Sequence, residues 1–194
     1  MLSKVSSAAA QGVDAAPVEV EVDVSAGMPK EQVVGLPDAA VKESLHRVRA
    51  AMTNAGYHWP FNKRVTVNLA PADTRKEGPI YDLPIALGLM AASEQMSVEK
   101  LGDYLFVGEL ALDGKLRPVK GALLYALLAK ELKKKGLFVP PENAREAAVV
   151  EGVQVFAPPD LPTAAAVLNG LATLPPVTVN LDELFAQAGS DGPL

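Results

Sequence analysis

A continuous apolar run, Leu83 to Ala92, constrains the fold of this chain more than any other segment. Asp82 precedes the run, and Pro84 lies in the first turn, where a missing amide costs no hydrogen bond, so the pattern predicts a helix over residues 82–93. The helix is apolar nearly all round, and it is far shorter than the ~20 residues that cross a bilayer. It is therefore expected to be a central helix that other elements bury on every side.

Two segments have the period-two pattern of strands with one buried face. Val18 to Val24 alternates valine with acidic residues, and Val65 to Leu69 alternates aliphatic with polar residues. Between them, Asp38 is a candidate N-cap for a helix over residues 38–55, which Gly56 ends. Because the polar face of the first strand is acidic, that face should repel nucleic acid.

Further elements alternate along the second half of the chain. We expect a hairpin that joins residues 105–109 to 115–117, strands over 137–139 and 153–156, and helices over 122–135, 142–150 and 163–168. Interleaved strands and helices predict an α/β or α+β fold with two layers and a mixed sheet. Residues 1–174 are expected to form one domain, and residues 175–194 a linker.

Composition narrows the function classes. Hydrophobic residues are 49% of the chain and charged residues 21%, which favours a folded core. The chain has no cysteine and no signal-peptide pattern at Met1, so a cytoplasmic location and no membrane contact are expected. The net charge of −5 argues against a protein that coats nucleic acid.

Four basic residues flank the second strand and are the candidate nucleic-acid contacts: Lys63, Arg64, Arg75 and Lys76. The alternative is that they form an ordinary solvated face.

Few side chains offer catalysis or cofactor binding. The two histidines, His46 and His58, are twelve residues apart in unrelated contexts, so no metal site is expected. The segment from Gly108 to Lys115 resembles a phosphate-binding loop, but it has one residue too many between its glycines and Leu116 in place of the hydroxyl. No nucleotide or other cofactor is therefore expected in this chain.

Several segments together resemble one known family. Residues 34–44 read VGLPDAAVKES, residues 67–73 read VNLAPAD, and residues 76–88 read KEGPIYDLPIALG. With residues 108–121 and 139–144, which follow in the expected order, they resemble the magnesium-chelatase-like AAA+ proteins of the ComM/YifB type over about residues 1–170.

The resemblance implies a ChlI-like N-terminal domain with the fold of the Lon protease proteolytic domain, which is related to a ribosomal-protein fold. It also implies an AAA+ module downstream that takes ATP and Mg²⁺, neighbouring subunits in a hexamer, and DNA branch migration during natural transformation. The partners expected for this chain are thus its own AAA+ module, neighbouring subunits and DNA.

The Lon comparison also implies where catalytic residues would lie. Lon-type peptidases pair a serine in a Gly-Pro-Ser segment with a lysine that follows a Pro-x-Gly-Gly turn. Here Ile80 follows Gly78-Pro79, and Leu123 stands at the lysine position. Aliphatic side chains can neither attack a carbonyl nor accept a proton, so no catalytic residue is expected. Lys120 is three residues away from the lysine position.

The family-motif loop contains Gly78, Pro79, Tyr81 and Asp82. In the structural interpretation, Asp82 caps the central helix and Gly78-Pro79 sets a turn. In the rival interpretation, the loop contacts a neighbouring subunit or DNA.

The sequence therefore favours a non-catalytic module for assembly and DNA guidance, attached to an AAA+ ATPase. One alternative is a Lon-like Ser-Lys peptidase or self-cleaving domain, which Ile80 and Leu123 oppose. Another is a motor subunit of a porphyrin magnesium chelatase, which is not expected to begin with a Lon-like extension.

Overall fold

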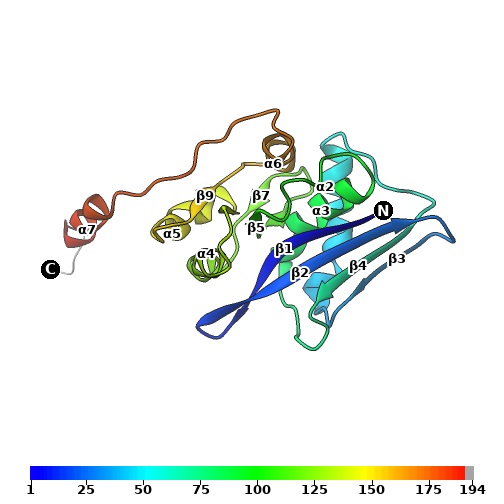
Figure 1. Ribbon diagram of the computed structural model, residues 1–194, viewed down its shortest axis with the longest axis horizontal. Coiled ribbons are helices and arrows are strands. Elements are labelled where there is room, and N and C mark those ends of the chain that lie inside the picture. Colours follow the sequence, from blue (N-terminus) through cyan, green and yellow to red (C-terminus); the bar gives the residue numbers. More distant parts are fainter. Residues whose placement is uncertain (191–194) are drawn as a thin grey trace.

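The structure is a computed structural model that describes residues 1–190 (Figure 1). Its largest sheet has four strands in the order β1-β2-β4-β3. The strands are β1 (Leu2–Gln11), β2 (Asp14–Ser25), β3 (Lys30–Val34) and β4 (Arg64–Ala70). Strand β2 runs antiparallel to both β1 and β4, whereas β3 runs parallel to β4. The sheet is therefore mixed, as predicted.

The two predicted strands are confirmed, but β1 and β3 were not predicted. In β2 and β4 the aliphatic residues of the alternating pattern are buried, as the register that places Val22 opposite Val67 requires. Strand β1 is less apolar, and two buried serines hold it in place. The Ser3 hydroxyl donates to the Gly88 carbonyl at 2.7 Å, and the Ser7 hydroxyl donates to the Phe106 carbonyl at 2.7 Å.

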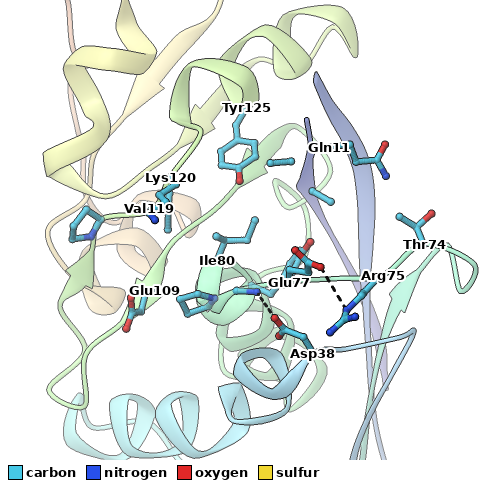
Figure 2. A pocket seen from close by; sticks show the side chains of 16 residues that line it. Gln11, Asp38, Thr74, Arg75, Glu77, Ile80, Glu109, Val119, Lys120 and Tyr125 are labelled. Atoms are coloured by element: carbon cyan, nitrogen blue, oxygen red, sulfur yellow. Dashed lines mark hydrogen bonds and ion pairs between the residues drawn. The ribbon is translucent and has the colours of Figure 1, made fainter. Parts of the chain in front are cut away.

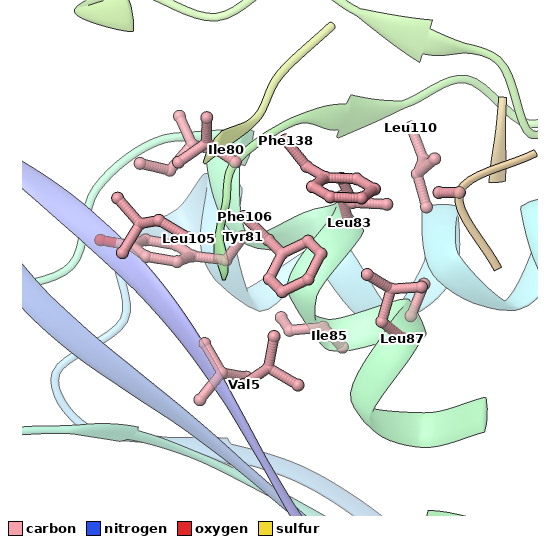
Figure 3. Close-up of a cluster of buried hydrophobic side chains, with 14 of the residues drawn as sticks. Val5, Ile80, Tyr81, Leu83, Ile85, Leu87, Leu105, Phe106, Leu110 and Phe138 are labelled. Atoms are coloured by element: carbon pink, nitrogen blue, oxygen red, sulfur yellow. The ribbon is translucent and has the colours of Figure 1, made fainter. Parts of the chain in front are cut away.

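The predicted central helix is α3 (Asp82–Ala92), and all eleven of its residues are buried. It packs on β1 and β2 so closely that a Cβ on Gly88 would lie 2.7 Å from a Val22 methyl group. Figure 3 shows the apolar side chains of α3 beside Val5 of β1 and beside Phe106, which ends strand β5 (Tyr104–Phe106). This packing explains why the helix is apolar on all faces, since other elements cover each of them.

The helix predicted over residues 38–55 is divided in two. Asp38 caps α1 (Ala39–Lys42) by accepting a hydrogen bond from the Val41 amide at 2.9 Å, as predicted. After Glu43, the chain continues as α2 (Ser44–Asn54), which packs against α3.

The predicted hairpin over 105–117 is partly wrong. Its outer part is β5 (Tyr104–Phe106), which instead joins β8 (Gly136–Phe138) and β9 (Gln154–Phe156) in a parallel sheet. Only β6 (Glu109–Leu110) and β7 (Leu116–Arg117) form the antiparallel pair. The aromatic rings of Tyr104, Phe138 and Phe156 pack together on the three parallel strands, a long-range contact that outweighs local hairpin pairing.

Helices α4 (Ala122–Glu131), α5 (Ala144–Ala148) and α6 (Leu161–Leu168) are confirmed with shifted ends, and two short 3₁₀ helices, η1 (Pro79–Tyr81) and η2 (Pro141–Asn143), precede α3 and α5. The segment predicted as a linker contains helix α7 (Leu181–Ser190), which lies apart from the sheets in Figure 1. Residues 191–194 of that predicted linker lie outside the described part. Within residues 1–190, no helix combines the length and apolarity needed to cross a membrane.

Candidate functional site

A cavity of about 800 Å³ lies between the end of β1, the loop that follows β4, and the segment that leads into α4 (Figure 2). The predicted motif loop forms one wall of this cavity. The residues that line the cavity are Ala9, Ala10, Gln11, Asp38, Thr74, Arg75, Glu77, Gly78, Pro79, Ile80, Tyr81, Glu109, Pro118, Val119, Lys120 and Tyr125.

Lys76 holds the loop together from inside, which corrects its prediction as a nucleic-acid contact. Its side chain is fully buried, and its ammonium donates to the carbonyls of Gly35, Pro71 and Thr74. The bond to Gly35 is 2.9 Å long. An ammonium with three carbonyl partners inside the protein cannot also neutralise a phosphate at the surface.

Two backbone features bring the segment before α1 against this loop. The Asp38 amide donates to the Lys76 carbonyl at 2.9 Å, and the Lys76 amide donates to the Leu36 carbonyl at 3.0 Å. Gly35 has a φ of 104°, and a Cβ there would lie 2.2 Å from the Leu69 carbonyl oxygen. Only glycine allows this approach, so residues 34–38 and 76–78 form one interlocked unit.

The predicted turn at Gly78-Pro79 is confirmed. Gly78 has a φ of 79°, and Pro79 begins η1. The Gly78 amide donates to the Asp38 carboxylate at 3.1 Å, the same carboxylate that caps α1. One side chain therefore fixes both the start of α1 and the start of the turn.

Asp82 does not cap the central helix, contrary to prediction. It is the first residue of α3, and its carboxylate accepts two hydrogen bonds from the Arg47 guanidinium, at 2.7 and 3.1 Å. The Leu110 amide donates to the same carboxylate at 3.1 Å. Burial raises the pKa of the Asp82 carboxyl, and these hydrogen bonds oppose that rise. The pair joins α2, α3 and β6 below the cavity.

The dyad positions do not meet at the cavity. Ile80 lines it, whereas Leu123 on α4 is 37% exposed and is not among the lining residues. Lys120 does line the cavity, but the lining set contains no serine or cysteine, and Thr74 is its only aliphatic hydroxyl. Within residues 1–190, no three histidine, cysteine or acidic side chains gather as metal ligands.

Two tyrosines lie in the wall: Tyr81 belongs to the predicted motif loop, whereas Tyr125 was not predicted as a site residue. The Tyr81 hydroxyl is buried and has no hydrogen-bond partner in the described part of the chain. Burial raises the pKa of Tyr81, and it raises the pKa of Tyr125 to about 12. Both hydroxyls therefore stay protonated at neutral pH and are available as donors. Nothing in the local sequence distinguishes such a tyrosine from one in an ordinary core.

The structure separates the predicted basic residues. Arg64 begins β4, and Arg75 follows its other end, beyond the roughly 20 Å that seven strand residues span. Arg75 is exposed and pairs with Glu77 at 3.5 Å. The four cations therefore do not form one patch, because a whole strand lies between two of them and Lys76 is buried.

Around Lys63 and Arg64, the fold adds residues that were not predicted as contacts. In the parallel register of β3 and β4, Lys30 stands opposite Arg64. The guanidinium carbon of Arg49, on α2, lies 4.7 Å from the centroid of the Phe61 ring. Phe61 is 61% exposed. We call Lys30, Arg49, Phe61, Lys63 and Arg64 the Phe61 corner.

The predicted acidic face of β2 is confirmed. Glu19 and Glu21 alternate with the buried valines of β2. Lys4 lies 3.9 Å from Glu19, and the Asn68 side chain donates to Glu21 at 2.8 Å.

Comparisons with known proteins agree with this architecture. A family model described as subunit ChlI of Mg-chelatase matches residues 20–143. The protein YifB of Escherichia coli strain K12 is 50% identical over 151 residues, which are 78% of this chain and 29% of that protein. Competence protein ComM of Haemophilus influenzae is 48% identical over 149 residues, which are 77% of this chain and 29% of that protein.

A more distant relative supports the Lon-like fold. A Lon protease of Halothermothrix orenii is 27% identical over 135 residues, which are 66% of this chain and 17% of that protein. The chain thus spans less than a third of the length of the curated relatives it matches. Since the ChlI model matches most of the chain and two relatives align with over three quarters of it, the chain belongs to the magnesium-chelatase-like ComM/YifB family, as its ChlI-type N-terminal domain.

Proposed function

We propose that this chain is a non-catalytic module that serves assembly and DNA guidance for an AAA+ ATPase of the ComM/YifB type. The observation that carries the proposal is a cavity whose lining contains no serine or cysteine, at the place where the Lon resemblance puts catalysis. Ile80 occupies the serine position, and Leu123 lies on α4 outside the lining of the cavity.

Neither of the other polar groups nearby supplies a replacement dyad. Thr74 has a hydroxyl in the cavity, but the nearest lysine in sequence, Lys76, is buried against three backbone carbonyls and does not line the cavity. Lys120 also lines the cavity, but Figure 2 shows it at the end opposite Thr74, so this lysine has no hydroxyl beside it to activate. These positions support a pocket that resembles that of a peptidase domain but does not cut its ligand.

A peptidase and ATPase assay on the pure chain tests this part of the proposal. We expect no turnover of casein, of a fluorogenic peptide or of ATP. Turnover that is abolished by Thr74→Ala or Lys120→Ala, both of which leave the buried loop contacts intact, would overturn the non-catalytic assignment. Turnover that survives both substitutions and purifies away from the chain would be a contaminant and would leave the assignment standing.

The Phe61 corner supports DNA guidance. It combines four cations with an exposed aromatic ring, the combination that holds nucleic-acid backbones and stacks on unpaired bases. At a net charge of −5 the chain has no general attraction for DNA, so binding has to come from such a local cluster. Several copies in a ring would strengthen a weak contact by avidity.

DNA binding by the full-length ATPase, measured at low and moderate salt, tests the corner. We expect Lys63→Ala with Arg64→Ala to weaken binding and to flatten the salt dependence, because each lost phosphate contact removes about 0.9 from the logarithmic slope. Arg75→Ala is the matched control at the other end of β4 and should change little. Unchanged affinity and slope in the double variant would reduce the proposed role to assembly.

Light scattering tests the assembly role. The full-length protein is expected to form a ring of subunits, and removal of this domain is expected to weaken that ring at low concentration. Rings of equal stability with and without the domain would contradict the assembly role.

A further inference from the structure

We propose that the cavity beside Ile80 binds an extended polypeptide segment, held by hydrogen bonds from the hydroxyls of Tyr81 and Tyr125 and by the ammonium of Lys120. This inference rests on the proposed function in one respect: the segment is bound and not cut.

The first support is the unsatisfied hydroxyl of Tyr81. The side chain is fully buried, and its hydroxyl has no partner in the described part of the chain. Figure 3 shows the ring within the apolar core cluster, where neighbours such as Leu105 fix its direction. A buried hydroxyl without a partner costs stability, and a core ring cannot turn its hydroxyl to water. The wall of the cavity is where an acceptor can be supplied.

The second support is the convergence of two more donors on the same space. Figure 2 shows Tyr125 reaching from α4 toward Ile80, with Lys120 beside it. Neither the Tyr125 hydroxyl nor the Lys120 ammonium has a partner among residues 1–190. Both tyrosine hydroxyls are protonated at neutral pH, as tyrosines ordinarily are, and burial raises their pKa values further. Of the three donors, only the Tyr81 hydroxyl is buried without a partner, and Lys120 is exposed to water. A ligand with acceptor oxygens at these points would give Tyr81 a partner and would replace water at the other two donors.

The charge of the lining decides which acceptor-rich ligand fits. Three carboxylates line the cavity, those of Asp38, Glu77 and Glu109, against the two cations Arg75 and Lys120. Arg75 already pairs with Glu77 at 3.5 Å. A nucleic acid would bring a row of negative charges against these carboxylates, whereas a peptide brings neutral carbonyl oxygens.

The shape and the apolar lining favour an extended chain. In Figure 2 the cavity runs from Gln11 and Thr74 at one end to Val119 and Lys120 at the other. Small or apolar side chains lie between them, including Ala9, Ala10, Pro79 and Ile80. At about 800 Å³, the space is within the range of about 300–1,000 Å³ that holds ligands in proteins. An extended peptide presents alternate side chains to such a floor and a carbonyl at every residue.

Because the Tyr81 hydroxyl is shut off from solvent in the free chain, a carbonyl can reach it only when a neighbouring side chain moves. Tyr125 is the neighbour on the cavity side, since it lines the cavity and lies close enough to Tyr81 to influence its titration. The bound state therefore includes a shift of the Tyr125 ring that opens the wall and gives both hydroxyls a partner.

Tyr81→Phe separates this proposal from a purely structural role. The substitution removes the unsatisfied hydroxyl, so the melting temperature of the free chain should stay the same or rise. Affinity for peptide should fall about fivefold, the loss of one neutral hydrogen bond. The probe is a fluorescein-labelled nine-residue peptide of alanine and valine with one glutamate, and the readout is fluorescence anisotropy with the pure chain.

A matched pair of lysine variants tests the end of the cavity that contains Lys120. Lys120→Ala should remove the preference for the glutamate peptide over the same peptide with lysine in that position. Lys100→Ala, which makes the same charge change at an exposed position outside the cavity lining, should leave that preference intact. An unlabelled thymidine oligonucleotide is the competitor, and it should not displace the labelled peptide.

Three results would overturn the inference: no peptide binding by the chain, binding that Tyr81→Phe and Lys120→Ala leave unchanged, or displacement of the peptide by the oligonucleotide. Cleavage of the bound peptide would overturn the non-catalytic function and would leave the peptide site standing. The two proposals therefore fail in different measurements.

Discussion

The two ends of β4 use charge in opposite ways. Beyond Ala70, two charged groups are buried: Lys76 donates to three backbone carbonyls, and Asp82 pairs with Arg47. The exposed Arg75 in the same loop pairs with Glu77. At Arg64, the charges of the Phe61 corner lie at the surface. The motif residues are thus mostly structural, whereas Lys63 and Arg64 at the other end are exposed and can contact a partner.

Arg47→Ala should give the largest effect, because it leaves the Asp82 carboxylate buried without its cation. We expect a loss of about 3–5 kcal/mol in the free energy of unfolding, measured with urea. Arg49→Ala is the control on the same helix, since its pair with Glu31 is 3.7 Å long and half exposed. A loss below about 1 kcal/mol for Arg47→Ala would be that of an exposed pair. The charges at the two ends of β4 would then not differ in their contribution to stability.

The Arg47→Ala loss should also depend on pH. Burial raises the pKa of the Asp82 carboxyl, so the folded state binds this proton more tightly than the unfolded chain, whose aspartate pKa is about 3.9. The destabilising charge is therefore relieved as the pH falls through the raised pKa. Without Arg47 the pKa rises further, and the variant should recover part of its loss at pH 4.5 relative to pH 7. An equal loss at both pH values would show that Asp82 is not the group responsible.

Lys76→Met should have the next largest effect. The substitution keeps the buried stem and removes the hydrogen bonds to the carbonyls of Gly35, Pro71 and Thr74, so we expect a loss of about 2–3 kcal/mol. Thermal and urea unfolding measure it. Lys63→Met is the matched control at the exposed end. If the two variants lose the same stability, Lys76 does not hold the loop.

The smallest stability effect is expected at the Phe61 corner. Lys63→Ala combined with Arg64→Ala should change the free energy of unfolding by less than about 0.5 kcal/mol, because both side chains are exposed. The same urea titration measures it. A loss above about 2 kcal/mol would mean that these cations are structural, and their effect on DNA would then no longer report a contact.

The sequence pattern was sufficient to predict those helices and strands whose buried residues are apolar in a continuous run or at every second position. The apolar run from Leu83 predicted α3, and the alternating valines predicted β2. Strand β1 was missed because serines and alanines dominate it, and its place depends on hydrogen bonds from Ser3 and Ser7 to distant carbonyls. Tertiary contacts decided these elements.

The site was predictable only in part for the same reason. The turn at Gly78-Pro79 and the loss of the dyad at Ile80 are local or motif features. The burial of Lys76 depends on Gly35, 41 residues away, and the Asp82 pair depends on Arg47, 35 residues away. No sequence period links residues at such distances, so a lysine beside an exposed arginine looked equally exposed.

The position of Trp59 lets tryptophan fluorescence distinguish binding at the Phe61 corner from binding at the cavity. It is the only tryptophan, its ring is 4% exposed, and the guanidinium of Arg49 lies 5.6 Å from its centroid. Its indole nitrogen donates to Glu31 at 3.0 Å. Emission excited at long wavelength therefore comes from a single fluorophore next to the Phe61 corner, whereas Tyr81 and Tyr125 absorb at the cavity. A ligand that changes the colour or intensity of that emission has reached the corner, and one that leaves it constant has gone elsewhere.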